Sequence, residues 1–170
     1  MRNNVDISEI LQDLGFIVGF RGDAGYTVLE HPDLMIEFLV AEKRKGDLKP
    51  KYIDRLGVTP QAVRYVGMLD SNPIELTYGD IVINVPHPVN FALHKILLST
   101  IRKQKAKADV DRMQGIKLLK DLLKHGDKEN IKSEYEKLKR PWKLAIRRSM
   151  SDSPDADILK EITGRSNKTA

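Results

Sequence analysis

One carboxylate stands in the middle of the most strand-like run of the chain. Glu37 lies within Leu34-Met35-Ile36-Glu37-Phe38-Leu39-Val40, where every neighbour is apolar. A carboxylate in apolar surroundings is costly unless it is paired, exposed on one face or bound to a metal. Strand alternation places Glu37 on the face opposite Ile36 and Phe38, so it is also typical of the outward residue of a half-exposed strand. A metal ligand and an ordinary surface glutamate both stay open here.

Two lysines and an aspartate further along have the types and spacing of a phosphate site or of ion pairs. Lys95 stands one helical turn after Phe91, in a predicted helix that begins directly behind Pro86-His87-Pro88. It is either a phosphate ligand or a solvated lysine on an amphipathic helix. Lys107 and Asp111 are four residues apart and therefore neighbours on one helix face, where they could form an ordinary surface ion pair.

The basic run from Arg102 to Lys107, which lies beside the carboxylates of Asp109 and Asp111, contains no aromatic residue. It is therefore more typical of a general phosphate-attracting patch than of a platform for base stacking. Trp142 lies among basic residues, but its helical spacing with Leu138 and Ile146 favours a core anchor over a base stacker. The four histidines are too scattered to indicate a metal site.

Composition excludes several kinds of chemistry. The 170 residues contain no cysteine, which removes disulfides, thiolate zinc sites and thiol nucleophiles. No GxGxxG, GxxxxGK[ST], GxSxG or EF-hand loop is present. No apolar run approaches the roughly 20 residues that span a bilayer, and the start lacks the order of a signal peptide, so a cytoplasmic protein without membrane contact is expected. The net charge of +5 fits a phosphate-rich partner or merely solvated lysines.

The hydrophobic pattern predicts an α+β protein in which a mixed sheet is followed by a C-terminal helical region. We expect a sheet-containing part over residues 1–86, a helical part over 87–150, and a weakly helical or flexible tail over 151–170. The pattern predicts a short helix over 5–14, strands over 16–20, 26–29, 34–40, 73–77 and 81–85, an exposed basic loop over 42–55, a brief helix or turn at 59–61, and helices from 88, 106, 131, 141 and 155 onward.

Three segments in order resemble a known family. They are Gly15-Phe16 through Leu34-Met35-Ile36-Glu37-Phe38-Leu39, then Gly57-Val58-Thr59-Pro60-Gln61-Ala62, then Val85-Pro86-His87-Pro88-Val89-Asn90-Phe91-Ala92-Leu93-His94-Lys95-Ile96-Leu97-Leu98-Ser99. With Arg102, Lys107 and Asp111-x-x-Gln114, they resemble bacterial nucleotidyltransferase-fold proteins of the minimal-transferase and abortive-infection-toxin type, over about residues 5–125. The strand-Pro-x-Pro-helix run ending in Phe-x-Leu-His-Lys is the most specific part.

The resemblance implies roles for individual residues. In that family a Gly-Ser turn and an Asp-x-Asp strand hold the nucleotide phosphates and two divalent ions, and a third acid on a later strand completes the site. Glu37 matches the third acid, which implies a catalytic, Mg²⁺-binding glutamate. Lys95, Lys107 and Asp111 match positions of the helical half that hold the triphosphate or support the site. The implied reaction transfers a nucleotidyl group from a nucleoside triphosphate to an RNA or protein acceptor.

One departure from the family pattern bears on activity, because no Gly-Ser followed by Asp-x-Asp precedes Glu37. The sequence is therefore expected to be a fragment, a split gene product whose partner chain supplies the missing segment, or a degenerate member, and to be catalytically incomplete by itself. The alternative is a non-catalytic module that contacts nucleic acid or a protein through residues 43–55 and 102–107. A third possibility is an antitoxin-like or scaffold subunit whose helical tail packs on a partner.

Overall fold

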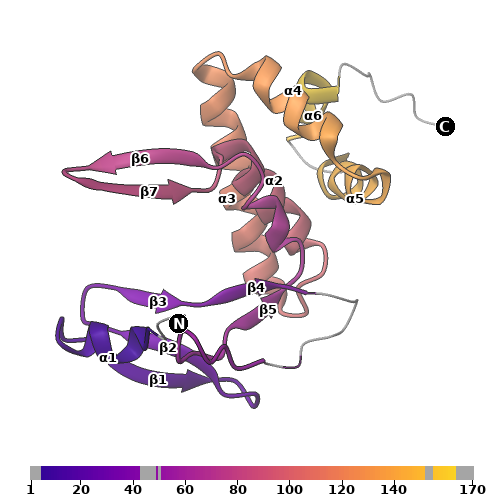
Figure 1. Ribbon diagram of the computed structural model, residues 1–170. Coiled ribbons are helices and arrows are strands. Elements are labelled where there is room, and N and C mark those ends of the chain that lie inside the picture. Colours follow the sequence, from indigo (N-terminus) through magenta and orange to yellow (C-terminus); the bar gives the residue numbers. More distant parts are fainter. Residues whose placement is uncertain (1–4, 43–48, 50, 152–154, 164–170) are drawn as a thin grey trace. The chain divides into compact units, whose positions relative to one another are not determined.

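The computed structural model describes residues 5–42, 49, 51–151 and 155–163, and the chain divides into two compact units, Met1–Val66 and Gly67–Ala170 (Figure 1). Small sheets fill the first unit, and helices dominate the second. The predicted α+β class, with sheet before helices, is confirmed. The predicted divisions at residues 86 and 150 stay predictions. Residues 43–48 and 50 of the predicted basic loop, and 152–154 and 164–170 of the predicted tail, lie outside the described residues.

The first unit begins with a short capped helix and a hairpin, as the pattern predicts. Asp6 caps α1 (Ile7–Gln12), because its carboxylate accepts hydrogen bonds from two backbone N–H groups of the first turn. Strands β1 (Ile17–Arg21), β2 (Tyr26–Glu30) and β3 (Met35–Glu37) form an antiparallel sheet in that order. Val28 and Leu29 of β2, together with Val58, are the most buried apolar side chains described in the first unit.

The run over residues 34–40 does not form one strand, which corrects the sequence prediction. It is divided at Phe38 into β3, which pairs with β2, and β4 (Leu39–Ala41), which pairs in parallel with β5 (Gln61–Val63). The Phe38 carbonyl accepts a hydrogen bond of 2.8 Å from the Gln61 N–H, so the chain changes its pairing partner there. Apolar pattern alone carries no sign of this exchange.

The brief helix or turn predicted at residues 59–61 is also wrong, because Gln61 begins strand β5. Long-range hydrogen bonds hold this segment extended. The Thr27 N–H donates to the Thr59 carbonyl at 2.8 Å, and the Thr59 N–H donates to Thr27 Oγ1 at 2.9 Å. Tertiary pairing here overrides the local Thr-Pro helix signal.

In its described residues the second unit has one hairpin and five α-helices. Strands β6 (Ile74–Tyr78) and β7 (Ile81–Val85) pair as predicted, and the 3₁₀ turn η1 (Val66–Met68) precedes them. The helices are α2 (Pro88–Ser99), α3 (Lys105–Lys124), α4 (Lys128–Lys137), α5 (Arg140–Ser151) and α6 (Ala156–Thr163). His87 caps α2 through Nδ1, and Pro88 takes its first position. No helix of the described residues has the length and apolar character to span a bilayer.

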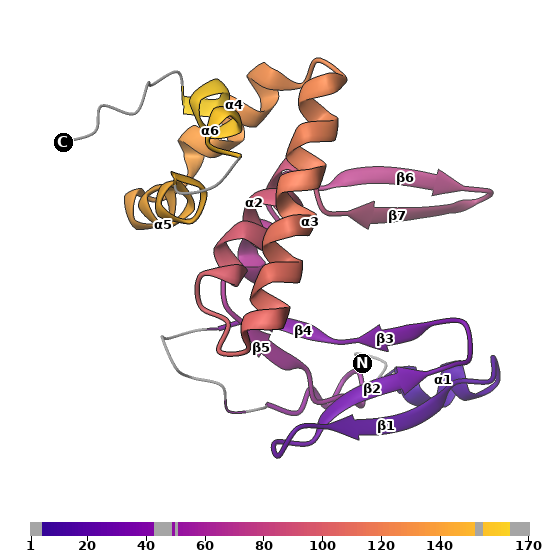
Figure 2. The ribbon, with the colours of Figure 1, turned by 180° about the vertical axis from the view of Figure 1, so that it is seen from behind.

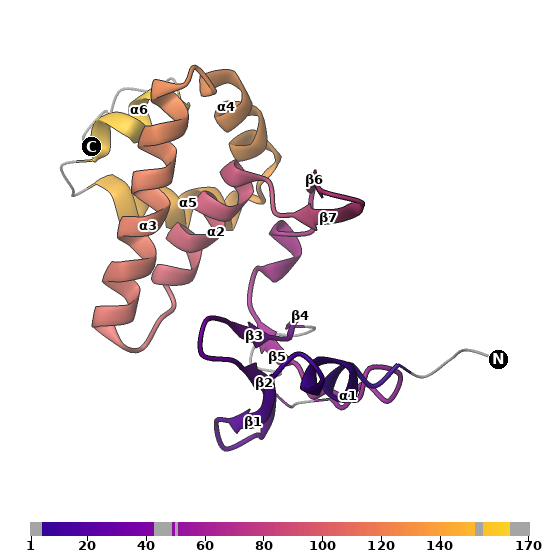
Figure 3. The ribbon, with the colours of Figure 1, turned by 90° about the vertical axis from the view of Figure 1, so that its left-hand side faces the viewer.

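Helices α2 and α3 lie side by side and form the centre of this unit (Figure 2). Gly115 permits their close approach, because a Cβ at this position would lie 2.6 Å from the Ala92 carbonyl oxygen and 2.8 Å from Ile96 Cγ1. Helices α4 and α5 pack on α2, and α6 packs on both of them (Figure 3). Val89, Leu93, Ile96, Leu97 and Leu119 are fully or almost fully buried in this packing.

Candidate nucleotide site and its relatives

A buried carboxylate binds two cations between α2 and α3. Asp111 on α3 is 4% exposed. Its Oδ1 accepts a hydrogen bond of 2.8 Å from Lys95 Nζ on α2, and its Oδ2 accepts one of 2.8 Å from Arg102 Nε in the connection between the helices. We call Lys95, Arg102 and Asp111 the Asp111 cluster. Its formal net charge is +1.

The helix packing explains why these groups meet. Gly115 follows Asp111 by one turn on the same face of α3, and a Cβ there would also come within 3.2 Å of Lys95 Cβ. The absent side chain therefore lets α3 lie against the turn of α2 that carries Lys95. Arg102 returns to Asp111 from the short connection that follows α2. The cluster thus joins three consecutive segments.

The electrostatics of the cluster keep Asp111 ionised. Burial raises the pKa of this carboxyl group, but the hydrogen bonds and charges of Lys95 and then Arg102 outweigh burial and hold its pKa below the ordinary aspartate value. The carboxylate is consequently negative at neutral pH. Its hydrogen bonds hold the Lys95 and Arg102 side chains in place, although each of these side chains has several rotatable bonds.

Part of the cationic surface at the Asp111 cluster is exposed and accessible to a ligand. The side chain of Arg102 is 39% exposed, and its hydrogen bond to Asp111 uses Nε, one of the nitrogens of the guanidinium. The Lys95 side chain is 21% exposed, and its Nζ also lies 5.6 Å from the centroid of the Phe91 ring. Lys107 is exposed on the turn of α3 before Asp111. These cations have the charge that a triphosphate needs.

The predicted Lys107–Asp111 ion pair is wrong. Within the described part of the chain, both carboxylate oxygens of Asp111 bind Lys95 and Arg102 instead. The sequence indicated Lys95, Lys107 and Asp111 as individual candidates but did not predict that Lys95 pairs with Asp111. Lys95 is 16 residues from Asp111, so the only available signal was that two consecutive helices would pack antiparallel.

Glu37 belongs to the first unit and ends β3, where its side chain is 45% exposed. The register pairs Ile36 with buried Leu29 and places Glu37 beside Val28 on the other face. On that face Arg21 NH1 lies 3.9 Å from Glu37 Oε1, while Arg21 NH2 donates to Glu30 Oε1 at 2.9 Å. The outward position that strand alternation indicates is therefore the observed one.

A divalent metal, which nucleotidyltransferases typically use, needs several oxygen ligands. Across residues 5–42, 49, 51–151 and 155–163, no three His, Cys, Asp or Glu side chains gather at one place. Glu37 has the right type of oxygen, but its nearest charged partner is the Arg21 guanidinium. The described residues thus do not fit a magnesium centre by themselves.

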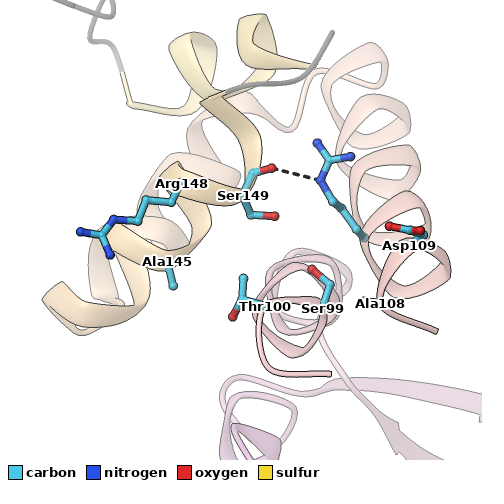
Figure 4. A pocket seen from close by; sticks show the side chains of 8 residues that line it. Ser99, Thr100, Ala108, Asp109, Ala145, Arg148 and Ser149 are labelled. Atoms are coloured by element: carbon cyan, nitrogen blue, oxygen red, sulfur yellow. Dashed lines mark hydrogen bonds between the residues drawn. The ribbon is translucent and has the colours of Figure 1, made fainter. Parts of the chain in front are cut away.

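A cavity of about 520 Å³ lies between α2, α3 and α5 in the second unit (Figure 4). Ser99, Thr100, Ala108 and Ala145 give it walls of small side chains. Arg112 also lines the cavity, and its Nε donates to the Ser149 carbonyl at 3.0 Å. The hydroxyls of Ser99 and Thr100 donate to carbonyls of α2, and the charged residues of the lining are Asp109, Arg112 and Arg148.

An α+β chain with a cation cluster fixed between two helices is consistent with a protein that handles phosphate groups. A family model described as Nucleotidyltransferase matches residues 1–139. The chain therefore belongs to the nucleotidyltransferase family, and the predicted family is confirmed at this level. No curated protein and no solved structure matches the chain.

Proposed function

We propose that this chain takes part in nucleotidyl transfer from a nucleoside triphosphate, and that Lys95, Arg102 and Lys107 hold the triphosphate. Family membership supports a nucleoside triphosphate as substrate. The observation that carries the proposal is the Asp111 cluster, in which a buried carboxylate fixes two cations beside an exposed lysine.

Cations held in fixed positions are suited to nucleotidyl transfer. In nucleotidyl transfer the protein mainly positions the phosphates and neutralises charge that develops on their oxygens. Cations that are already fixed lose little conformational freedom when the substrate binds. Asp111 acts here as a positioning residue, since it touches the cations and not the substrate.

Glu37 is proposed as the acid that this chain contributes to a Mg²⁺ site, with the companion acids coming from a partner chain. Support comes from the first unit, which exposes many large apolar side chains that a further polypeptide would cover. These are Val5, Ile10, Leu14, Ile17, Phe20, Leu34, Met35, Leu39 and Tyr52. The acceptor that we propose is RNA or protein.

Nucleotide binding by calorimetry tests the triphosphate assignment. Lys107→Met should weaken binding of a nucleoside triphosphate about fivefold, equivalent to about 1 kcal/mol. Lys117→Met is the matched control, because Lys117 is also an exposed lysine of α3. Equal effects of the two substitutions, or no binding by the unaltered chain, would refute the assignment.

A transfer assay tests Glu37. Labelled nucleoside triphosphates with Mg²⁺ or Mn²⁺ and tRNA are incubated with the purified chain, and incorporation into RNA or protein is measured. If incorporation occurs at an enzyme-like rate and Glu37→Ala leaves that rate unchanged, Glu37 is not the metal-binding acid.

The second candidate is a non-catalytic nucleic-acid-binding module. Lys103, Lys105 and Lys107 are all exposed around the start of α3, and this observation favours it. Binding through such lysines should weaken steeply as salt rises, because counterions are released from the phosphates. Binding to RNA and DNA that is undetectable, or independent of salt, would count against this candidate.

A further inference from the structure

A second, smaller pocket of about 170 Å³ lies in the second unit, away from the Asp111 cluster. The residues that give it chemistry are Asn90 on α2, Glu134 and Lys137 on α4, and Lys139 and Trp142 at the start of α5. Trp142 lies beyond residues 1–139, which the family model matches. Lys95, Arg102 and Lys107, which are proposed to hold the triphosphate, do not line this pocket.

Two buried side chains of this pocket each keep an oxygen available as acceptor. Glu134 is 3% exposed, and Lys137 Nζ donates to its Oε1 at 2.6 Å. Asn90 is also 3% exposed, and its Nδ2 donates to the Ser71 carbonyl at 2.7 Å, which fixes Oδ1 as the remaining acceptor. Nothing in the described part of the chain donates to Glu134 Oε2 or Asn90 Oδ1.

The pocket also has an aromatic wall and a basic rim. Trp142 is half-buried, and Lys139 Nζ lies 5.4 Å from its ring centroid. The side chain of Lys137 is 60% exposed, so its ammonium group reaches solvent beside Glu134. One carboxylate and two lysines leave a formal charge of +1 around the opening.

These features define a ligand with three properties. A flat ring suits the indole, N–H groups suit the two acceptor oxygens, and an anionic group suits the lysines. A cavity of about 170 Å³ has room for one small ring system.

We propose that this pocket binds the amino-bearing base of a nucleotide. The ring lies against Trp142, the exocyclic amino group donates to Glu134 Oε2 and Asn90 Oδ1, and the phosphate lies near Lys137 and Lys139. Uracil lacks the amino group and offers these two acceptors only its N3–H, which has a carbonyl oxygen on either side, so adenine and cytosine bind better. The inference goes beyond the proposed transfer function and does not depend on it.

Intrinsic fluorescence gives a direct test, because Trp142 is the only tryptophan of the 170 residues. The full chain is titrated with AMP, CMP and UMP at low salt. We expect a saturable change with AMP or CMP, at a Kd at least about tenfold lower than for UMP. Equal affinity for all three, or no saturable change with any, would overturn the proposal.

Variants tie the binding to the pocket. Glu134→Gln keeps the shape and loses the charged acceptor, so binding of the preferred nucleotide should weaken about tenfold. Lys132→Ala, an exposed lysine of the same helix, should leave it unchanged. Should Glu134→Gln fail to fold by circular dichroism, Trp142→Leu is tested by equilibrium dialysis with labelled AMP. Wild-type affinity in either folded variant contradicts the assignment.

Free nucleotide and single-stranded RNA present the same base and phosphate. Short oligoadenylate and oligouridylate therefore form a second arm of the titration. Oligoadenylate binding at least about tenfold tighter than AMP identifies RNA as the occupant, because further phosphates then reach the lysines. Comparable affinities identify the free nucleotide. Both results support the base pocket, and failure of the triphosphate test above leaves it intact.

Discussion

Asp111 shows how one carboxylate organises a cationic site. If the almost fully buried carboxylate of Asp111 is removed, the charges of Lys95 and Arg102 are no longer neutralised. The resulting loss of stability is larger than the contribution of an exposed ion pair. Lys95 and Arg102 stay partly exposed, at 21% and 39%, so water offsets part of this cost. The cluster should therefore contribute moderately to stability and strongly to the geometry of the cations.

Asp111→Asn should lower the free energy of unfolding by about 2 kcal/mol at neutral pH. The pKa of Asp111 is lowered on folding, so its contribution is fully present above the unfolded aspartate pKa of about 3.9. It is lost as pH falls through the lower, folded pKa. Urea unfolding at pH 7 and pH 3 should therefore show a difference between wild type and variant that shrinks in acid.

Asp109→Asn is the matched control, because Asp109 is an exposed aspartate of the same helix. It should change stability by less than about 0.5 kcal/mol at both pH values. A pH-independent difference for Asp111→Asn would mean that the carboxylate is not the stabilising feature.

The sequence predicted the individual residues of this site better than the contacts between them. Lys95 and Asp111 were indicated by type and by resemblance, and Glu37 by its apolar neighbours. Their partners were not predicted, because the Lys95–Asp111 contact requires α2 and α3 to pack, and the Arg21–Glu37 contact requires the register of a three-stranded sheet. The buried acceptors Asn90 and Glu134 gave no sequence signal, since polar residues in helices are usually exposed.

Among the elements, periodicity predicted the five α-helices that the structure describes in the second unit, and the two predicted hairpins are found as β1–β2 and β6–β7. It failed where the chain changes its pairing partner. The break at Phe38 and the extended segment that begins β5 depend on hydrogen bonds between residues far apart in sequence, such as those between Thr27 and Thr59. Local patterns do not contain that information.

The close α2–α3 contact gives a prediction for Gly115→Ala. Alanine raises intrinsic helix propensity by about 1 kcal/mol, but its Cβ would lie 2.6 Å from the Ala92 carbonyl oxygen, a backbone atom that cannot rotate away. The cost of overpacking, about 1–3 kcal/mol, should exceed this gain in helix propensity. We expect net destabilisation of about 1–2 kcal/mol in thermal or urea unfolding.

Gln114→Ala separates the two effects, because Gln114 is the neighbouring residue of α3 and is exposed. It should gain helix propensity without a clash and leave stability equal or slightly higher. If Gly115→Ala behaved like Gln114→Ala, the helices would not approach as closely as the Asp111 cluster requires.

Across the whole chain, buried apolar side chains are divided unequally between the two units. The first unit has Val28, Leu29, Val58 and Val66 among the described residues. The second has a continuous set across its helices: Met68, Val89, Ala92, Leu93, Ile96, Leu97, Ile116, Leu119, Ile131, Tyr135, Ile146, Met150, Ile158, Leu159 and Ile162. Composition indicated an ordinary core but not where it lies, because burial follows from packing.

This division predicts different behaviour when the units are separated. Residues 67–170 expressed alone should retain helical circular dichroism and unfold cooperatively, because their core comes from their own helices. Leu93→Ala in that fragment should lower its stability by about 2–5 kcal/mol, which shows that the packed core is present. Residues 1–66 alone should show no cooperative transition, since so few buried side chains do not offset the entropy of folding. Non-cooperative melting of fragment 67–170, or a stable fold of 1–66 by itself, would contradict this account, and the latter would also weaken the case for a partner chain that covers the first unit.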